Sequence, residues 1–320
     1  MVGPSSKYKI LVTDYVWPST APEQEVLAQI GAEVIEAPDP SEDTLATLAK
    51  DADGIMTCFA QVTPRVVEAA KKCVVISRYG VGVDNIAVDT ATQEGIVVTY
   101  VPDYCIDEVS NHVMALLLTW NRQIGFYDQV AKQGQWGGTR SPVPLTRLRG
   151  QKLGILGLGR IGRAVAEKAR AFGMEVLGYD PYWEADQSTT LGVRLMDLGS
   201  LLKDADYVTV HTPLNQQTQG LIGADQFAVM KRNAFIINCA RGPIIDETAL
   251  YDALRNGLIA GAGLDVMEQA EPPASHPIFT LDNVLITPHV AFLSQQLHLQ
   301  VPKLALSPFQ EFFYLNTHLL

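Results

Sequence analysis

Short hydrophobic runs alternate with segments of helical pattern along almost the whole chain. Runs such as Ile10–Thr13 are apolar or β-branched, and the segments between them repeat apolar residues at helical spacing. Such alternation predicts βαβ units around a parallel sheet. In the first part of the chain we expect helices from about Pro22, near Leu45, at residues 64–70 and after Asp84, and strands at Ile10–Thr13, Ala32–Ile35, Gly54–Thr57, Val74–Ser77 and Ile96–Val98.

A long apolar-periodic stretch separates this first set from a second one. It runs from about Cys105 to Arg122 after Pro102, and it predicts a helix that crosses between two domains. The tail from Gln295 to Leu320 contains Pro302 and Pro308, so no structure is assigned to it. The strands of the second set are expected at Leu153–Leu156, Glu175–Tyr179, Tyr207–Val210, Ala234–Ile237, Gly261–Leu264 and Val284–Thr287.

Composition narrows the class of protein. The 320 residues are 47% hydrophobic and 18% charged, which is typical of an ordered protein of two globular domains. A formal net charge of −11 argues against binding to nucleic acid, and no apolar run approaches the ~20 residues of a membrane span. With no signal peptide at Met1–Lys9, we expect a cytoplasmic protein. The cysteines lack metal-site or disulfide spacing, so no metal is expected, and they lie at Cys58, Cys73, Cys105 and Cys239.

A glycine-rich turn predicts a dinucleotide site. Gly157, Gly159 and Gly162 follow the strand Leu153–Leu156 and open a helix over Ile161–Phe172, so that the turn brings free helix amides to a pyrophosphate. Arg160 and Ile161 belong to the same turn. The next strand ends at Asp180, whose carboxylate suits the ribose hydroxyls of NAD and repels the extra phosphate of NADP. NAD is therefore the expected cofactor.

Two further residues suit the reduction of a carbonyl group by a bound dinucleotide. This chemistry needs a cation that polarises the carbonyl, and a proton donor for the developing alkoxide. Arg241 follows an apolar strand, and its guanidinium binds oxygen pairs in a planar fork. His289 follows the strand Val284–Thr287, and imidazole titrates near neutral pH. Arg241 and His289 are therefore the candidate catalytic residues.

Taken together, these motifs resemble those of the D-isomer-specific 2-hydroxyacid dehydrogenases. The resemblance covers nearly the whole chain and rests on residues 80–85, 157–162, 211–214, 238–243, 263–266 and 287–289. It implies an α/β fold of two doubly wound parallel-sheet domains, with a Rossmann NAD-binding domain inserted into a flavodoxin-like substrate domain. The implied boundaries are 1–104, 105–290 with the crossing helix, and 291–320 as a return to the substrate domain.

The resemblance also implies roles for residues that chemistry alone does not single out. Asp265 would hold the nicotinamide carboxamide, and a homodimer would form with help from the crossing helix. The closely spaced glycines after the fourth strand let backbone amides converge on an anion, and by resemblance they bind the substrate carboxylate. Tyr79 either narrows the substrate pocket or packs in the core. The full sets are His211, Thr212, Pro213, Cys239, Ala240 and Asp265 for the cofactor, and Tyr79, Gly80, Val81, Gly82 and Arg241 for the substrate.

The sequence departs from the family at one catalytic position. The family pairs its histidine with a glutamate that raises the histidine's pKa. The usual position of that glutamate falls here on Ala270, with Glu268 before it and Glu271 after it. We favour Glu271 because it keeps the Glu-Pro step, and Glu268 remains the alternative.

Three functions stay open at this stage. The main prediction is an NAD-dependent oxidoreductase that transfers a hydride between NADH and a small 2-oxo or D-2-hydroxy acid. The chain also resembles transcriptional C-terminal-binding proteins, which use the same fold to sense NAD and control assembly. The shifted glutamate and irregular tail are compatible with an inactive relative as well.

Overall fold

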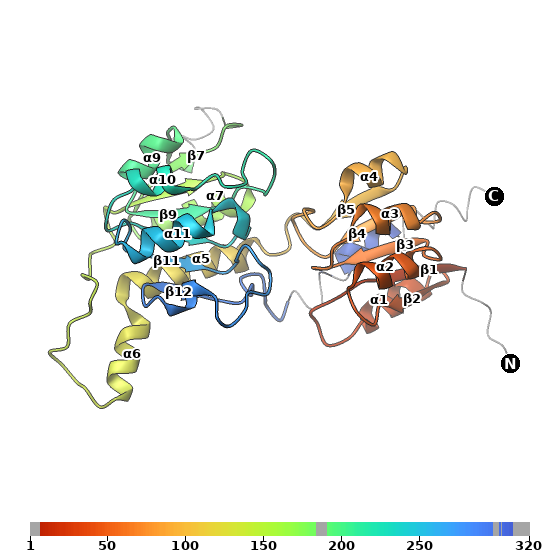
Figure 1. The fold of residues 1–320 in the computed structure, drawn as a ribbon, viewed down its shortest axis with the longest axis horizontal. Helices are drawn as coiled ribbons and strands as arrows, with labels where there is room; N and C mark the ends of the chain where they lie inside the picture. Colours follow the sequence, from red (N-terminus) through yellow and green to blue (C-terminus); the bar gives the residue numbers. More distant parts are fainter. Residues whose placement is uncertain (1–6, 184–190, 297–300, 302, 310–320) are drawn as a thin grey trace. The chain divides into compact units, whose positions relative to one another are not determined.

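The computed structural model describes residues 7–183, 191–296, 301 and 303–309. The chain divides into two compact units (Figure 1). The first unit comprises the described residues of Met1–Tyr104 and Ser294–Leu320, and the second comprises those of Cys105–Leu293. Each unit is built on its own parallel sheet, which confirms the predicted fold class.

The sheet of the first unit has five strands in the order β2-β1-β3-β4-β5. This is the flavodoxin-like order, in which ligands bind beyond the carboxyl ends of the strands. The central strands β3 and β4 are buried along their whole length because helices cover both faces. The strands are β1 (Tyr8–Val12), β2 (Ala32–Glu36), β3 (Gly54–Thr57), β4 (Val75–Arg78) and β5 (Val97–Tyr100).

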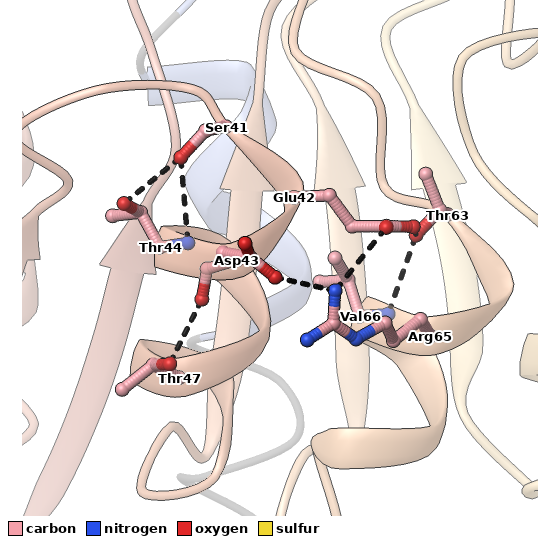
Figure 2. Close-up of polar contacts among 8 residues, drawn as sticks. All are labelled: Ser41, Glu42, Asp43, Thr44, Thr47, Thr63, Arg65 and Val66. Atoms are coloured by element: carbon pink, nitrogen blue, oxygen red, sulfur yellow. Dashed lines mark hydrogen bonds and ion pairs between the residues drawn. The ribbon is translucent and has the colours of Figure 1, made fainter.

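Helices α2 and α3 begin at side-chain caps (Figure 2). The hydroxyls of Ser41 and Thr63 accept hydrogen bonds from the third amide beyond each of them, at 3.4 Å in both cases. Such caps satisfy amides that the first turn of a helix leaves without partners. Arg65 then joins the two helices through ion pairs to Glu42 and Asp43. The helices of this unit are α1 (Ala21–Ala28), α2 (Glu42–Ala49), α3 (Pro64–Ala69) and α4 (Val88–Gln93).

A helical segment from the end of the chain packs against this first sheet. Residues 303–309 are helical, and the Ala305 carbonyl accepts a hydrogen bond from the Ser77 hydroxyl of β4 at 2.7 Å. Pro308 has no N–H to offer the Leu304 carbonyl, and the Ser307 hydroxyl donates to that carbonyl instead at 3.2 Å. Pro308 thus lies within the described helical segment, and the carbonyl that it leaves without an amide donor has a side-chain partner. The rest of the tail, 297–300, 302 and 310–320, lies outside the described residues.

The second unit contains a seven-stranded parallel sheet in the order β12-β11-β10-β9-β6-β7-β8. The reversal of strand order beside β6 is the Rossmann arrangement, which places the dinucleotide at the ends of these strands. All six predicted strands match the observed positions to within one residue. The strands are β6 (Lys152–Leu156), β7 (Glu175–Tyr179), β8 (Val193–Leu195), β9 (Tyr207–Val210), β10 (Phe235–Asn238), β11 (Gly261–Leu264) and β12 (Val284–Ile286).

The long helix α5 spans Ile106–Arg122, close to its prediction. Its Trp120 stacks on Phe235 of β10 with ring centroids 4.6 Å apart, which anchors the helix to the sheet. The sequence did not predict β8, a short edge strand, or α6 (Ile124–Lys132), none of whose residues is buried. The remaining helices are α7 (Arg160–Ala171), α9 (Leu198–Asp204), α10 (Ala224–Val229) and α11 (Glu247–Arg255), with short 3-10 turns η1 (Gly242–Ile244) and η2 (Pro277–Thr280).

Within the described ranges, no helix is both long enough and apolar enough to cross a membrane.

The C-terminal helical segment provides a test of the fold. Phe309 is fully buried, and its ring occupies the space that a Cβ on Gly54 of β3 would need. We expect Phe309→Ala to destabilise the first unit by about 3–5 kcal/mol, the usual cost of removing a buried phenylalanine ring. Denaturant unfolding followed by hydrogen exchange of β3 and β4 measures this. Leu304→Ala is the control because Leu304 lies on the same helical segment and is 46% exposed. Equal stability losses in the two variants would contradict the packing described here.

Candidate dinucleotide and catalytic site

Two glycines of the turn after β6 are required by close backbone approach. Gly157 has φ of +95°, and a Cβ there would lie 2.8–2.9 Å from backbone atoms of His211 and Thr212. A Cβ on Gly162 would collide with the Gly157 carbonyl. These contacts fold the turn tightly onto α7 and onto the loop after β9. The sequence motif is therefore a consequence of backbone packing.

Gly159 differs from its two neighbours because a Cβ there would meet nothing within 4 Å. It precedes α7, whose first residues Arg160 and Ile161 carry amides that the helix itself cannot satisfy. Gly159 and Arg160 are exposed, and Ile161 is half-buried. The open space in front of these amides fits a pyrophosphate, which the partial positive charge of a helix N-terminus favours.

Asp180 lies directly after β7 and faces the turn. Its carboxylate accepts the Leu158 amide at 2.8 Å and the Tyr182 amide at 3.0 Å. Each oxygen thus carries one of these hydrogen bonds and retains a lone pair for a further donor. The two amides fix the carboxylate beside the glycine turn, where a ribose diol would be expected.

The loop after β9 contains three of the predicted cofactor residues. Burial lowers the pKa of His211 to about 3, so its imidazole is neutral at physiological pH. Its Nε2 lies 2.9 Å from the Thr209 hydroxyl. The neighbouring Thr212 is buried, and within the described part of the chain its hydroxyl has no hydrogen-bond partner. A buried hydroxyl without a partner beside the glycine turn fits contact with a bound ligand, while Pro213 is exposed.

Arg241 is held in the loop after β10. The buried Asn238 accepts the Ala240 amide at 3.0 Å and donates to the Arg241 carbonyl at 2.9 Å, which closes the loop on itself. Gly242 packs so tightly on the Met267 backbone that no side chain would fit. Arg241 is half-buried, and so are Cys239 and Ala240. Burial, with the nearby Asp265 charge adding, raises the pKa of Cys239 well above its usual value, so its thiol is not a thiolate nucleophile.

His289 occupies a strained turn after β12. Its φ of +53° lies in the left-handed region, which a bulky side chain rarely adopts. The turn is held by Asp265, at the end of β11. The Asp265 carbonyl accepts the His289 amide at 2.8 Å, and the Asp265 carboxylate accepts the amides of Val290 and Ala291 at 2.9 and 3.0 Å. Asp265 therefore fixes the backbone from which the imidazole of His289 projects, and that ring lies edge-on to Phe292 with centroids 5.8 Å apart.

The two candidate glutamates lie in the loop between β11 and η2, and both are exposed. The loop is tied to α11 at both ends by Glu247. One carboxylate oxygen of Glu247 accepts the Glu268 amide at 3.0 Å, and the other lies 2.8 Å from Nε2 of His276. Along the chain, Glu271 lies between Glu268 and His276, the two residues that Glu247 holds. Its pairing with His289 stays a prediction.

In the first unit, the predicted carboxylate loop follows β4. Gly80 is buried, Val81 is exposed and Gly82 is half-buried. A Cβ on Gly80 would fall on the Arg78 guanidinium, so a buried arginine lies beneath the loop. The Tyr79 ring is 2% exposed, and its hydroxyl donates to Glu23 at 3.0 Å. That is the environment of a packing residue, and a role for Tyr79 in substrate binding stays a prediction.

Sequence reasoning missed several residues that shape these loops. Asp14, after β1, accepts the amides of Cys58 and Phe59 at 2.9 and 2.6 Å and so fixes the loop after β3. Arg78 and His112 were also missed. Arg78 follows a predicted strand, as Arg241 does. That position was the one feature of the sequence that could have singled out Arg78. His112 had no signal because its partner is Thr287, 175 residues away.

Comparison with known proteins places these features in a family. The family model for the "D-isomer specific 2-hydroxyacid dehydrogenase, NAD binding domain" matches residues 114–291. A D-3-phosphoglycerate dehydrogenase from Methanocaldococcus jannaschii is 44% identical over 283 residues, covering 88% of this chain and 53% of that protein. A glyoxylate reductase from Korarchaeum cryptofilum is 39% identical over 264 residues, covering 82% of this chain and 79% of that protein. The present chain thus spans about half the length of the phosphoglycerate dehydrogenase it matches.

A solved structure agrees with these sequence matches. The structure of D-lactate dehydrogenase from Aquifex aeolicus, complexed with NAD and lactic acid, superposes with a TM-score of 0.88 at 28% identity. The match covers 97% of this chain and 96% of that chain. These relatives are named as dehydrogenases or reductases, which favours an enzyme over the NAD-sensing alternative.

Two glycines of the turn, Gly162 and Gly159, should respond in opposite ways to replacement by alanine. Gly162→Ala should destabilise the second unit by about 1–3 kcal/mol, because its methyl group collides with backbone that cannot move aside. Gly159→Ala should leave stability within about 0.5 kcal/mol, yet weaken NADH binding by about tenfold by filling the space before the helix amides. Thermal unfolding and NADH fluorescence titration measure the two effects. Normal NADH affinity in Gly159→Ala would mean that the nucleotide lies elsewhere.

Proposed function

The chain belongs to the D-isomer-specific 2-hydroxyacid dehydrogenase family, and we propose that it is an NAD-dependent enzyme acting on a small 2-oxo acid or its D-2-hydroxy acid. One observation carries the proposal. Arg241, Asp265 and His289 follow β10, β11 and β12, which are neighbouring parallel strands. Their carboxyl ends meet at one edge of the sheet, where ligands of such folds bind. A cation, a buried carboxylate and an imidazole are thus grouped at the expected place.

Arg241 and His289 each have a proposed role that the chemistry of the side chain supports. The Arg241 guanidinium binds the carboxylate and carbonyl oxygens of the substrate in a planar fork and polarises the carbonyl. When bound, NADH supplies the hydride that the carbonyl carbon receives. His289 gives its proton to the alkoxide oxygen that develops as the carbonyl is reduced. His211, neutral because of its low pKa, does not compete with His289 as the proton donor.

The cofactor preference rests on Asp180. Its carboxylate is fixed by two backbone amides beside the glycine turn and can accept hydrogen bonds from a free ribose diol. A 2′-phosphate at the same position would meet a like charge. The Gly159 space, the first amides of α7 and the Thr212 hydroxyl would hold the remainder of the nucleotide. We therefore assign NAD in preference to NADP.

The loop after β4 is the proposed contact for the substrate carboxylate. The Gly80 amide already donates to the Arg78 carbonyl at 2.9 Å, so the amides that would serve an anion are those of Val81 and Gly82. The positive charge of Arg78 beneath the loop favours an anion above it.

A homodimer is part of the same proposal. Helix α6 has no buried residue, and the segment after it carries Trp136, which is 84% exposed. Ile124 and Leu145 in the same region are 55% and 41% exposed. Exposed apolar side chains that recur along one segment suit a surface that a partner covers. Location in the cytoplasm stays a prediction from the sequence.

The activity is tested by an NADH-oxidation screen over 2-oxo acids such as glyoxylate, hydroxypyruvate and pyruvate, with NADPH in parallel. We expect turnover with NADH and lower catalytic efficiency with NADPH. Arg241→Lys should lower kcat/KM by about 100-fold with NADH affinity retained, because an ammonium keeps the charge and loses the two-pronged contact. No turnover with any oxo acid would refute the proposed activity, and unchanged kinetics in the lysine variant would remove Arg241 from the site.

The glutamate assignment is tested by the pH dependence of reduction. A carboxylate beside His289 stabilises the protonated imidazole that reduction consumes. Glu271→Gln should therefore shift the alkaline limb of the rate profile to lower pH, since the donor then loses its proton earlier as pH rises. Glu268→Gln is the matched control and should leave the profile in place. A shift in the control alone would assign the role to Glu268, and no shift in either would show that His289 acts without a carboxylate partner.

A further inference from the structure

His112 lies on α5 and is connected to the candidate proton donor through two other side chains. Its Nε2 is 2.9 Å from the Thr287 hydroxyl oxygen and 3.6 Å from a carboxylate oxygen of Asp265. The Thr287 hydroxyl in turn lies 2.6 Å from that same Asp265 oxygen. The Asp265 side chain is 1% exposed and that of His112 is 21% exposed. The three groups thus form a largely buried chain within the second unit.

The number of available hydrogen-bond donors determines which atom donates in each hydrogen bond of this chain. A carboxylate only accepts hydrogen bonds, so the single hydroxyl proton of Thr287 goes to Asp265. The Thr287 oxygen must then accept from His112, which requires a proton on Nε2 of the imidazole. The chain therefore runs from the His112 N–H through the Thr287 hydroxyl to the Asp265 carboxylate.

This chain ends on the group that holds the His289 turn. The Asp265 oxygen that receives Thr287 also receives the Val290 amide at 2.9 Å, and the second oxygen receives the Ala291 amide at 3.0 Å. A carboxylate that rotated freely about its side-chain bonds would not hold the left-handed backbone conformation of His289. Thr287 adds a third hydrogen bond to this carboxylate, and His112 links Thr287 to α5, a helix of 17 residues whose Trp120 stacks on Phe235 of β10.

We propose that His112 is a positioning residue for the reaction, acting through Thr287 and Asp265 to aim the imidazole of His289 at the developing alkoxide. The expected effect on the reaction rate rests on the proposed function. The hydrogen-bonded chain from His112 to Asp265 rests on the observed geometry. His112 itself contacts no substrate. Its removal should lower the rate of the chemical step, because small errors in the placement of a catalytic group are costly, whereas binding should change little.

Matched substitutions separate the hydrogen bonds from simple packing. Thr287→Val keeps the shape and removes the hydroxyl, whereas Thr287→Ser keeps the hydroxyl. His112→Leu removes the ring N–H, whereas His112→Gln retains an N–H donor at a similar reach. We expect Thr287→Val and His112→Leu to lower kcat by about 10- to 100-fold, with the NADH dissociation constant within about threefold of the parent. The serine and glutamine variants should recover most of the lost rate.

Asn121→Leu is the control for general loosening of α5. The Asn121 amide donates to the Tyr207 hydroxyl at 3.0 Å and to the Thr146 carbonyl at 3.1 Å, away from Asp265. It should lower the unfolding temperature and leave kcat unchanged. An equal loss of kcat in Asn121→Leu, or equal rates in the valine and serine variants at position 287, would overturn the inference.

A second measurement does not depend on turnover. Long-range ¹⁵N–¹H spectra of the imidazoles should show His112 protonated on Nε2, and Thr287→Val should shift the ring signals of His289 as well as those of His112. Parent protein that reduces no 2-oxo acid but shows both spectral results would refute the proposed function and support the positioning chain. A proton on Nδ1 alone, or His289 signals unmoved by Thr287→Val, would overturn the chain whatever the activity.

Discussion

Asp265 joins the ends of three neighbouring strands through its backbone amide and its buried carboxylate. The geometry of the candidate active site depends on this residue. Its amide donates to the Asn238 carbonyl of β10 at 2.9 Å, and its side chain binds Thr287 and the turn after β12. A buried charge is tolerated only when hydrogen bonds replace its hydration. Here the hydroxyl and the two amides do so, which means that the site is organised by the same bonds that make the carboxylate tolerable.

The left-handed conformation of His289 follows from this arrangement. A non-glycine residue in the left-handed conformation costs of order 1–3 kcal/mol, and it persists only where the surrounding structure holds it there. Three consecutive amides, from His289 to Ala291, all donate to Asp265. An extended backbone could not direct all three at one residue, so the strain in His289 is the geometric condition for the clamp. The strain in His289 and the position of its backbone thus have a common cause.

The sequence predicted what depends on local chemistry. The strands are recognisable because buried parallel strands are continuous apolar runs, and the glycine turn because Gly157 and Gly162 meet backbone that no side chain could approach. It did not predict α6, none of whose residues is buried, or the helical segment at 303–309, where the Ser307 hydroxyl donates to the carbonyl that Pro308 leaves without its helical partner. The partnership of His112 with Thr287 was equally hidden, because residues 175 positions apart meet only once the sheet has formed.

The distribution of charge bears on how an acidic protein could accept the anionic substrate proposed above. A net charge of −11 repels a carboxylate at long range, although salt screens that repulsion beyond about 8 Å at physiological ionic strength. Attraction must then come from cations whose own surroundings are desolvated, where the interaction is stronger. Arg78 is 6% exposed beneath the Gly80 loop, and Arg241 is half-buried in the loop after β10. Arg78 is the last residue of β4 and Arg241 follows β10, so in each unit the carboxyl end of a parallel strand sets where the positive charge lies.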